Sequence, residues 1–313
     1  MSPRLLGVPE PVTVRVPAKV NLHLSVGPLR EDGYHELVTV YHAISLYDEV
    51  TATPARDLSV GIRGEGAALL PVDGENLVWR AAKLLAAHTG VSAAVRLDLV
   101  KGIPVASGLA GGSADAAATL VACDALWGTG LDRAELLALA ARLGSDVAFA
   151  LTGGTALGTG RGQHLTPVLA TGRWHWAIAV SGSGLLTPKV YGELDRMRSV
   201  GSPPAVGDPD ELINALRSHD PPRLGALLAN DLQAAALSLR PELRRTLRAG
   251  LDLGALGAVV SGSGPSCAFL ALSRETAVRL AASLSGAGVC RTVRVAHGPV
   301  SGARIVDRES SPG

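Results

Sequence analysis

Aromatic side chains are scarce in this chain of 313 residues, which contains two Phe, four Trp and four Tyr. Glycine, in contrast, is abundant: its 37 residues make up about 12% of the chain, where about 7% is usual. Gly and Pro together stay below the share of about 25–30% that is typical of low-complexity sequences. Because 47% of the residues are hydrophobic, a chain of this length can bury a core without disulfides or metal ions. We therefore expect a folded protein rich in Ala, Leu and Val, with many special backbone positions.

Cysteine is also rare. The three cysteines are odd in number, widely spaced and free of any Cys-x-x-Cys pair, which excludes a disulfide framework and a zinc site of the usual spacing. Each is expected to be a small buried hydrophobic residue: Cys123, Cys267 and Cys290. The sequence lacks an apolar run of about 18 residues, the length of a membrane span, and its start lacks the basic and apolar regions of a signal peptide. We expect a cytoplasmic protein with no membrane partner.

Neither sign of charge dominates the chain. Its 29 Lys and Arg residues balance 28 Asp and Glu residues and leave a formal charge of +1. Proteins that bind nucleic-acid phosphates usually carry a clear basic excess. The balance therefore argues against a nucleic-acid partner.

Hydrophobic periodicity divides the chain into strands and helices that mix without a regular βαβ order and without repeats. From Val12 to Val26 alternate residues are apolar, which predicts a strand with Lys19, Asn21 and His23 on its opposite face. Further strands are predicted at 37–46, 95–100, 174–180, 258–261, 267–272 and 289–295. Helices are predicted at 76–88, 113–126, 134–143, 222–239, 241–250 and 275–285. These patterns predict an α+β fold with two domains, 1–168 and 169–313.

A glycine-rich loop precedes one of these helices, in the segment from Pro104 to Leu120, which reads PVASGLAGGSADAAATL. Small residues let a backbone approach a ligand closely, and free N–H groups at a helix N-terminus suit a phosphate. The spacing is neither that of a Walker A loop nor that of a Rossmann fingerprint. Asp115, expected in the first helical turn, would repel an anion, so that metal or hydroxyl contacts would be needed nearby. The alternative is a tight packing turn between a strand and a helix.

Three further segments carry polar residues in patterns that suit either chemistry or plain structure. PAKVNLHL at residues 17–24 places Lys19 on a strand, where a lysine is usually a solvated edge charge. GSDV at residues 144–147 follows a predicted helix end, where its Ser or Asp would also serve to cap the next helix. VVSGSGPSCAFL at residues 259–270 places two glycines between two strands, where a hairpin turn is the alternative.

Taken in order, these four segments resemble the motifs of the GHMP kinase superfamily. Within it the chain is similar to the family of 4-diphosphocytidyl-2-C-methyl-D-erythritol kinases, from Pro17 to about Val295. The phrase DGYHEL at residues 32–37 separates this family from the superfamily's sugar, homoserine and mevalonate kinases, and TPKVY at residues 187–191 is a further mark. The resemblance implies two domains: an N-terminal ATP-binding domain resembling a ribosomal-protein domain, and a C-terminal α/β-sandwich domain on the substrate side.

The resemblance also implies an activity, the phosphorylation of the substrate's 2-hydroxyl by ATP in the non-mevalonate route to isoprenoid precursors. Asp146 would take the proton of that hydroxyl, and Lys19 would hold Asp146 ionised and favour charge on the reacting oxygens. The glycine-rich loop would wrap the ATP phosphates, with Ser113 as a contact to Mg²⁺. The loop consists of Pro104, Val105, Ala106, Ser107, Gly108, Leu109, Ala110, Gly111, Gly112, Ser113 and Ala114.

On the substrate side, the resemblance assigns residues to the cytidine diphosphate group. Tyr34 and Tyr191 match the positions that hold the cytosine ring between two aromatic faces. His35 matches the residue that hydrogen-bonds the edge of the base, and Asn21 one that contacts the substrate near the lysine. Thr187, in the TPKVY phrase, is expected on the substrate side too. The superfamily's third motif, which supports the phosphate end, matches Gly262, Ser263 and Gly264.

The loop departs from a fully glycine-rich version, GGGLGGGSS, at Ala106, Ser107, Ala110 and Ala114. All four residues stay small, so close backbone approach survives, but the lost hydroxyl at Ala114 weakens the case for one phosphate or metal contact. Two alternatives remain open. One is another small-molecule kinase of the superfamily, of the homoserine or mevalonate type; the other is a nucleic-acid-binding protein, because the N-terminal fold resembles a ribosomal-protein domain. The oligomeric state and the Mg²⁺ ligands stay open as well.

Overall fold

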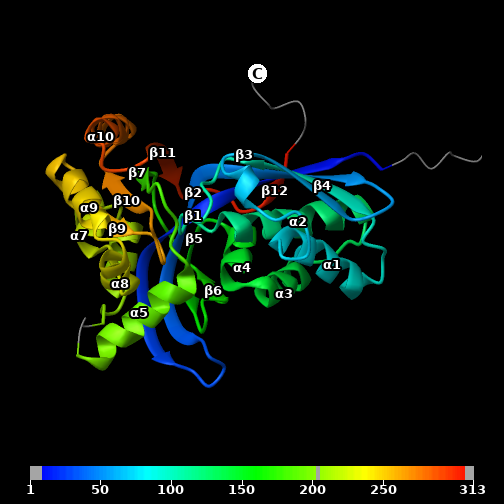
Figure 1. Ribbon diagram of the computed structural model, residues 1–313, viewed down its shortest axis with the longest axis horizontal. Helices are drawn as coiled ribbons and strands as arrows, with labels where there is room; N and C mark the ends of the chain where they lie inside the picture. The colour runs from blue at the N-terminus through cyan, green and yellow to red at the C-terminus, as the bar shows by residue number, and fades with distance from the viewer. Residues whose placement is uncertain (1–8, 202–204, 307–313) are drawn as a thin grey trace, which may run out of the picture.

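The structure, a computed structural model, describes residues 9–201 and 205–306 and contains two β-sheets with helices packed against them (Figure 1). The larger sheet has the strand order β12-β1-β2-β4-β3, with β5 and β6 extending from β2 and with β8 beside β1; the smaller has the order β11-β7-β10-β9. The strands are β1 (Val12–Leu29), β2 (His35–Pro54), β3 (Ser59–Gly64), β4 (Val95–Lys101), β5 (Thr155–Thr159), β6 (His164–Pro167), β7 (Trp174–Val180), β8 (Ala229–Asn230), β9 (Gly257–Val260), β10 (Cys267–Ala271), β11 (Thr292–Gly298) and β12 (Arg304–Ile305). The helices are α1 (Leu77–Thr89), α2 (Gly111–Trp127), α3 (Arg133–Leu143), α4 (Ser145–Thr152), α5 (Thr187–Ser199), α6 (Asp210–Ser218), α7 (Pro221–Leu227), α8 (Leu232–Leu239), α9 (Glu242–Asp252) and α10 (Arg274–Gly286). The predicted α+β class is confirmed.

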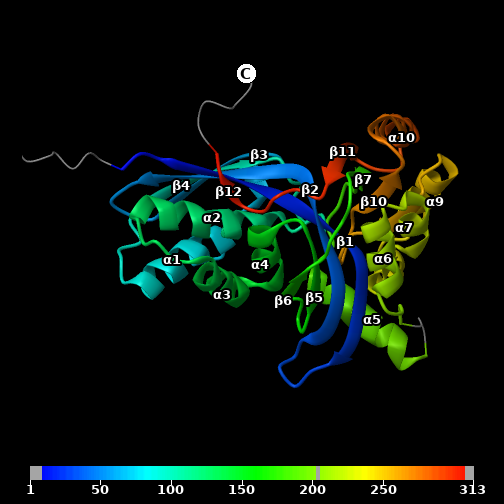
Figure 2. The same cartoon turned by 180° about the vertical axis from the view of Figure 1, so that it is seen from behind.

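Strands β1 and β2 form a long antiparallel hairpin that runs between the two groups of helices (Figure 2). The alternating Val and Leu side chains of β1 are buried in the core, as predicted. The opposite face is buried too: Lys19, Asn21 and His23 are each almost inaccessible to solvent. The reason is tertiary, because the Lys19 N–H donates to the Leu109 carbonyl of the glycine-rich loop, and β8 pairs with β1 at His23. Lys19 is therefore not a solvated edge charge.

Helix α2 lies at the centre of the N-terminal half, packed against β1, β2, α1 and α4. Its alanines are buried on several sides, as expected for a helix that is apolar all round. It begins at Gly111, two residues before the predicted start, because Ala110 in a left-handed conformation turns the chain directly into the helix. Gly111 and Gly112 are thus the first residues of the helix itself.

Most predicted elements are found. Helix α3 ends at Gly144, as predicted. Helix α1 begins at Leu77, one residue after its predicted start, because Asn76 caps it by accepting from the Val78 N–H. The predicted helix 222–239 is wrong in its middle, where β8 separates α7 from α8 because that dipeptide pairs with β1. The last long strand, β11, begins three residues later than predicted, at Thr292. Strand pairing thus overrides the local pattern at β8.

The division into domains at residue 168 stays a prediction. Strands β8 and β12 follow that position in the sequence, yet both pair with β1 in the larger sheet. The segments 1–8 and 307–313 and part of the predicted loop 199–209 lie outside the described residues. Within residues 9–201 and 205–306, no helix combines the length and apolarity that a membrane crossing requires.

Candidate active site

A cavity of about 530 Å³ opens between the β1–β2 hairpin, the glycine-rich loop, α4 and the start of α5. It brings together residues from all four sequence motifs. Of the predicted residues it is lined by Lys19, Asn21, Pro104, Val105, Ala106, Ser107, Gly108, Ala110, Gly111, Gly112, Ser113, Asp146, Thr187, Tyr191, Gly262, Ser263 and Gly264. Leu109 and Ala114 instead point into the core, and Tyr34 and His35 lie outside the lining.

Lys19 and Asp146 approach each other across the cavity although they lie far apart in the sequence. The Lys19 Nζ is 3.7 Å from the Asp146 Oδ2, and it donates to the Asn21 Oδ1 at 2.6 Å. Asn21 in turn donates to the Thr39 hydroxyl at 2.8 Å, which donates to the His23 carbonyl. The lysine is buried, whereas the Asp146 side chain is 33% exposed and faces the cavity. The expected contact between the two charges is confirmed.

The GSDV segment positions this carboxylate at the beginning of a helix. Gly144 is the N-cap of α4, and neither Ser145 nor Asp146 makes a side-chain cap, so the capping alternative is wrong. Asp146 lies in the first turn, where the positive end of the helix dipole stabilises a negative charge. The side chain therefore stays available to a ligand in the cavity.

Tyr41 belongs to this site although the sequence did not single it out. Its ring is buried against Phe149, with the ring centroids 4.8 Å apart, and the Lys19 Nζ lies 5.8 Å from its centroid. Burial raises the pKa of Tyr41 well above its ordinary value, and the negative charge of Asp146 raises it further. The sequence could have indicated Tyr41 only through the pairing register of β1 and β2, in which Tyr41 lies directly opposite Asn21.

The glycine-rich loop adopts left-handed backbone at three positions, with φ of 51° at Ala106, 80° at Gly108 and 61° at Ala110. Gly108 cannot be replaced without strain, because a Cβ there would lie 2.3 Å from the Ser261 carbonyl oxygen. The loop is tied to the segment between β9 and β10, since the Ser261 hydroxyl donates to the Gly108 carbonyl at 3.1 Å. That segment is both a connection between antiparallel strands and part of the cavity wall. Together they present the N-terminus of the 17-residue helix α2 to the cavity, a ready anion site.

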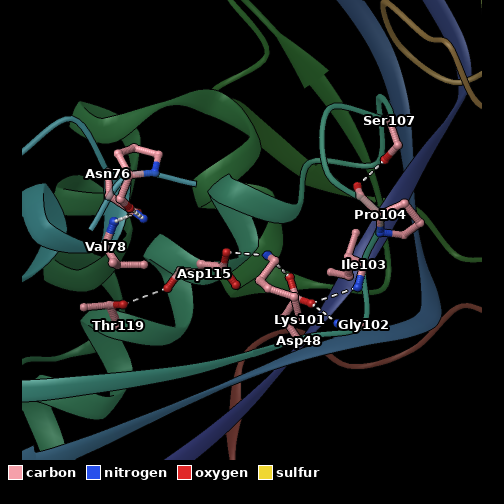
Figure 3. A network of polar contacts seen from close by, with 11 residues as sticks. Asp48, Asn76, Val78, Lys101, Gly102, Ile103, Pro104, Ser107, Asp115 and Thr119 are labelled. Carbon is pink, nitrogen blue, oxygen red and sulfur yellow. Dashed lines mark hydrogen bonds and ion pairs between the residues drawn. The ribbon is translucent and has the colours of Figure 1, made fainter. Parts of the chain in front are cut away.

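Beneath the loop, Lys101 at the end of β4 lies between two buried carboxylates, Asp48 and Asp115 (Figure 3). The second oxygen of Asp48 accepts from the N–H groups of Gly102 and Ile103 at 2.7 and 2.8 Å, which holds the start of the loop. The expectation that Asp115 lies in the first turn of the helix and repels an anion is wrong. It lies in the second turn and is paired with Lys101. Burial raises the pKa of Asp115 to about 8.

The aromatic residues of the substrate side occupy the hairpin tip and α5. Tyr34 is 57% exposed, with the Arg161 guanidinium 4.8 Å from its ring centroid. His35 stacks on Tyr191, with the ring centroids 5.3 Å apart. Burial raises the pKa of Tyr191. Both ring nitrogens of His35 have partners within the chain, the Gly27 carbonyl and Asp195, and its base-reading role stays a prediction.

No group of three or more His, Cys, Asp and Glu side chains in the described part of the chain is arranged to hold a metal ion. A magnesium ion that arrives with a nucleotide keeps several waters and needs only one or two protein oxygens besides the phosphates. The Ser113 hydroxyl and the Asp146 carboxylate both line the cavity.

Comparisons with known proteins agree on one family. Residues 76–154 match the family described as "GHMP kinases N terminal domain", and residues 212–290 match "GHMP kinases C terminal". The 4-diphosphocytidyl-2-C-methyl-D-erythritol kinase of Rhodococcus jostii is 60% identical over 300 residues, 96% of each chain. The protein of the same name from Nocardia farcinica is 60% identical over 303 residues, 97% of this chain and 99% of that one.

Solved structures extend the likeness to the fold. A crystal structure of 4-(cytidine 5'-diphospho)-2C-methyl-D-erythritol kinase aligns with a TM-score of 0.73 and 36% identity, over 91% of this chain and 98% of the other. A homoserine kinase from Cytophaga hutchinsonii aligns with a TM-score of 0.72 over 98% of this chain and 100% of the other, but at 20% identity it supports the fold alone. The chain belongs to the GHMP kinases and, within them, to the 4-diphosphocytidyl-2-C-methyl-D-erythritol kinase family.

Proposed function

We propose that the protein transfers the γ-phosphate of ATP to the 2-hydroxyl of 4-diphosphocytidyl-2-C-methyl-D-erythritol, giving the 2-phosphate and ADP in the non-mevalonate route to isoprenoid precursors. The observation that carries the proposal is the pairing of Lys19 with Asp146 at 3.7 Å inside a cavity walled by the glycine-rich loop. Family membership identifies the substrate class. The three cysteines are unpaired, which supports a cytoplasmic location.

In the reaction, the 2-hydroxyl oxygen bonds to the γ-phosphorus as the bond from that phosphorus to the ADP oxygen breaks. Asp146 accepts the hydroxyl proton, a role for which an ordinary carboxylate in good geometry is sufficient. The Lys19 ammonium, 3.7 Å from the Asp146 Oδ2, stabilises negative charge on the reacting oxygens. Tyr41, buried beside both residues, excludes water from that side.

The nucleotide would occupy the end of the cavity formed by the glycine-rich loop. Its phosphates would accept hydrogen bonds from the loop and from the N-terminus of α2, supported by Gly262, Ser263 and Gly264. Beyond the loop the lining is mainly apolar, with one amide and one carboxylate, and would hold the purine ring. These residues are Leu70, Pro71, Glu75, Asn76, Leu77 and Ile103.

Mg²⁺ is proposed as the nucleotide's counter-ion. Ser113 and Asp146 are the residues that would hold it, beside the phosphates themselves. When bound, the ion would neutralise charge on the phosphate oxygens.

The substrate would extend from Asn21 and Thr187 toward α5 and the hairpin tip. Thr187 shares a hydrogen bond of 2.9 Å with the Ser263 hydroxyl, which joins the substrate side to the third motif. Tyr34 and Tyr191 would hold the cytosine, and each face that stacks contributes about 0.5–1.5 kcal/mol beyond burial.

The test is ATP consumption by the purified protein with three acceptors: the cytidylylated methylerythritol, homoserine and mevalonate. Turnover is expected only with the first. Asp146→Asn should lower kcat by about 10²–10⁴, the contribution of a general base, while ATP binding by calorimetry is retained. Asp210→Asn, which removes an exposed carboxylate in the first turn of α6, is the matched control. Turnover of homoserine or mevalonate in place of the cytidine compound would refute the substrate, and a near-normal kcat in Asp146→Asn would refute the base.

A further inference from the structure

Glu65, directly after β3, connects the smaller sheet to the start of the glycine-rich loop. Its Oε1 accepts from Arg291, which precedes β11, and its Oε2 accepts from Arg294 on β11 at 3.0 Å. Its backbone N–H donates to the Lys101 carbonyl at 3.0 Å, at the end of β4. The Glu65 side chain is 18% exposed. Both carboxylate oxygens are thus engaged, and one residue joins three parts of the chain.

The residues that follow Glu65 form the wall of the cavity beyond the loop. Gly66 packs against the loop, since a Cβ there would lie 2.8 Å from the Val105 Cγ2. Pro71, in the same connection, lines the cavity. The Pro71 carbonyl accepts from the Asn76 side chain at 2.7 Å, which joins this wall to the start of α1. A displacement of Glu65 would therefore be transmitted to the loop and to the wall beyond it.

The smaller sheet is attached to the glycine-rich loop at a second place. The Ser266 N–H donates to the Ser107 carbonyl at 3.0 Å, and the Ser261 hydroxyl donates to the Gly108 carbonyl. These bonds hold the sheet to the part of the loop that faces the phosphate end. The Glu65 bridge holds the same sheet to the segment that leads to the opposite wall. The two attachments together set the separation between the phosphate end and that wall.

We propose that Glu65 is a positioning residue for the nucleotide: by binding Arg291 and Arg294 it holds the wall beyond the loop at the separation that a nucleoside diphosphate group needs. The inference rests on the proposed binding of ATP at that end of the cavity. None of these three residues is part of the cavity lining, so the bridge acts on the nucleotide through the backbone. Lys19 and Asp146 lie on other elements, so the chemical step is left intact.

The experiment measures the binding of ADP to the wild type, to Glu65→Gln and to Glu49→Gln by calorimetry. Glu65→Gln should bind ADP about threefold to tenfold more weakly, the range expected for two partly exposed ion pairs. The sign is diagnostic, because loss of a negative charge would by itself favour an anionic ligand. Glu49→Gln is the matched control and should bind ADP as the wild type does. Glu49 accepts from the Arg15 Nε and Nη2 at 2.9 and 2.7 Å, on the same sheet as β3 and outside the cavity lining.

A second variant tests the bridge itself. Arg294→Gln should also weaken ADP binding, and in combination with Glu65→Gln it should add little, because both changes break the same contact. In turnover, Glu65→Gln should raise KM for ATP while kcat and KM for the acceptor stay unchanged. At about 1 M salt, which screens partly exposed charges, its difference from the wild type should shrink.

Binding of ADP separates this inference from the proposed reaction. Unchanged or tighter ADP binding in Glu65→Gln, or additive losses in the double variant, would overturn the role of Glu65. Weaker ADP binding that depends on the bridge, in a protein that phosphorylates none of the three acceptors, supports this inference and refutes the proposed function alone.

Discussion

Replacing Lys101 with Met should destabilise the protein strongly at neutral and alkaline pH. The methionine has a similar length, so the change removes a charge and little packing. The side chains of Lys101, Asp48 and Asp115 are each at most 4% exposed, and the lysine is the cation that joins the two carboxylates. Removing one partner of a buried ion pair costs about 3–5 kcal/mol, because the remaining charge stays buried without compensation.

The expected pH dependence has a definite sign. In the wild type, burial raises the pKa of Asp115 to about 8, whereas an unfolded Asp has a pKa of about 4. Between these values the folded state binds more protons than the unfolded chain, so this group makes the free energy of unfolding fall as the pH rises. Loss of the Lys101 cation, which lowers the pKa of Asp115, raises that pKa further. The deficit of the Lys101→Met variant should therefore be largest at about pH 8 and shrink toward about pH 5.

Urea unfolding of both proteins, followed by circular dichroism at about pH 5 and about pH 8, measures the difference. Asp115→Asn is the matched control: it keeps the hydrogen bond to Lys101 but removes the net negative charge of the triad. It should stay within about 1 kcal/mol of the wild type and show a flatter dependence on pH. A Lys101→Met variant as stable as the wild type at about pH 8, or a deficit that does not shrink at about pH 5, would refute the reasoning.

Two further predictions concern the cavity. Gly108→Ala should raise KM for ATP about tenfold or more while the circular dichroism spectrum is unchanged. The added Cβ would collide with the Ser261 carbonyl oxygen, and a residue with a side chain pays about 1–3 kcal/mol for the left-handed backbone at this position. A KM within twofold of the wild type contradicts this prediction. Tyr41→Phe should lower kcat about tenfold with KM for ATP unchanged, because it removes the hydroxyl beside Asp146. A rise of about tenfold in KM for ATP would show instead that the substitution has shifted the whole cavity.

What the sequence predicts well depends on residues that are neighbours along the chain. Gly144 ends α3 because it interrupts a helical run. Strand β8 illustrates the opposite case. Asn230 lies where periodicity predicts a helix, but it donates to the carbonyls of Val260 and Gly262, and its strand pairs with β1. A local window contains none of these partners, so the break between α7 and α8 could not be predicted from it.

The same distinction separates the parts of the site. Lys19, Asn21 and Asp146 lie in motifs that can be read from the sequence, but Tyr41 does not. Tyr41 gains its role only because the fold places it beside Asp146. Of the four tyrosines of the chain, Tyr41 and Tyr191 line the cavity. Scarcity of a residue type does not by itself mark function here, because Trp174, Trp176 and Phe269 are equally rare and lie fully buried in the core.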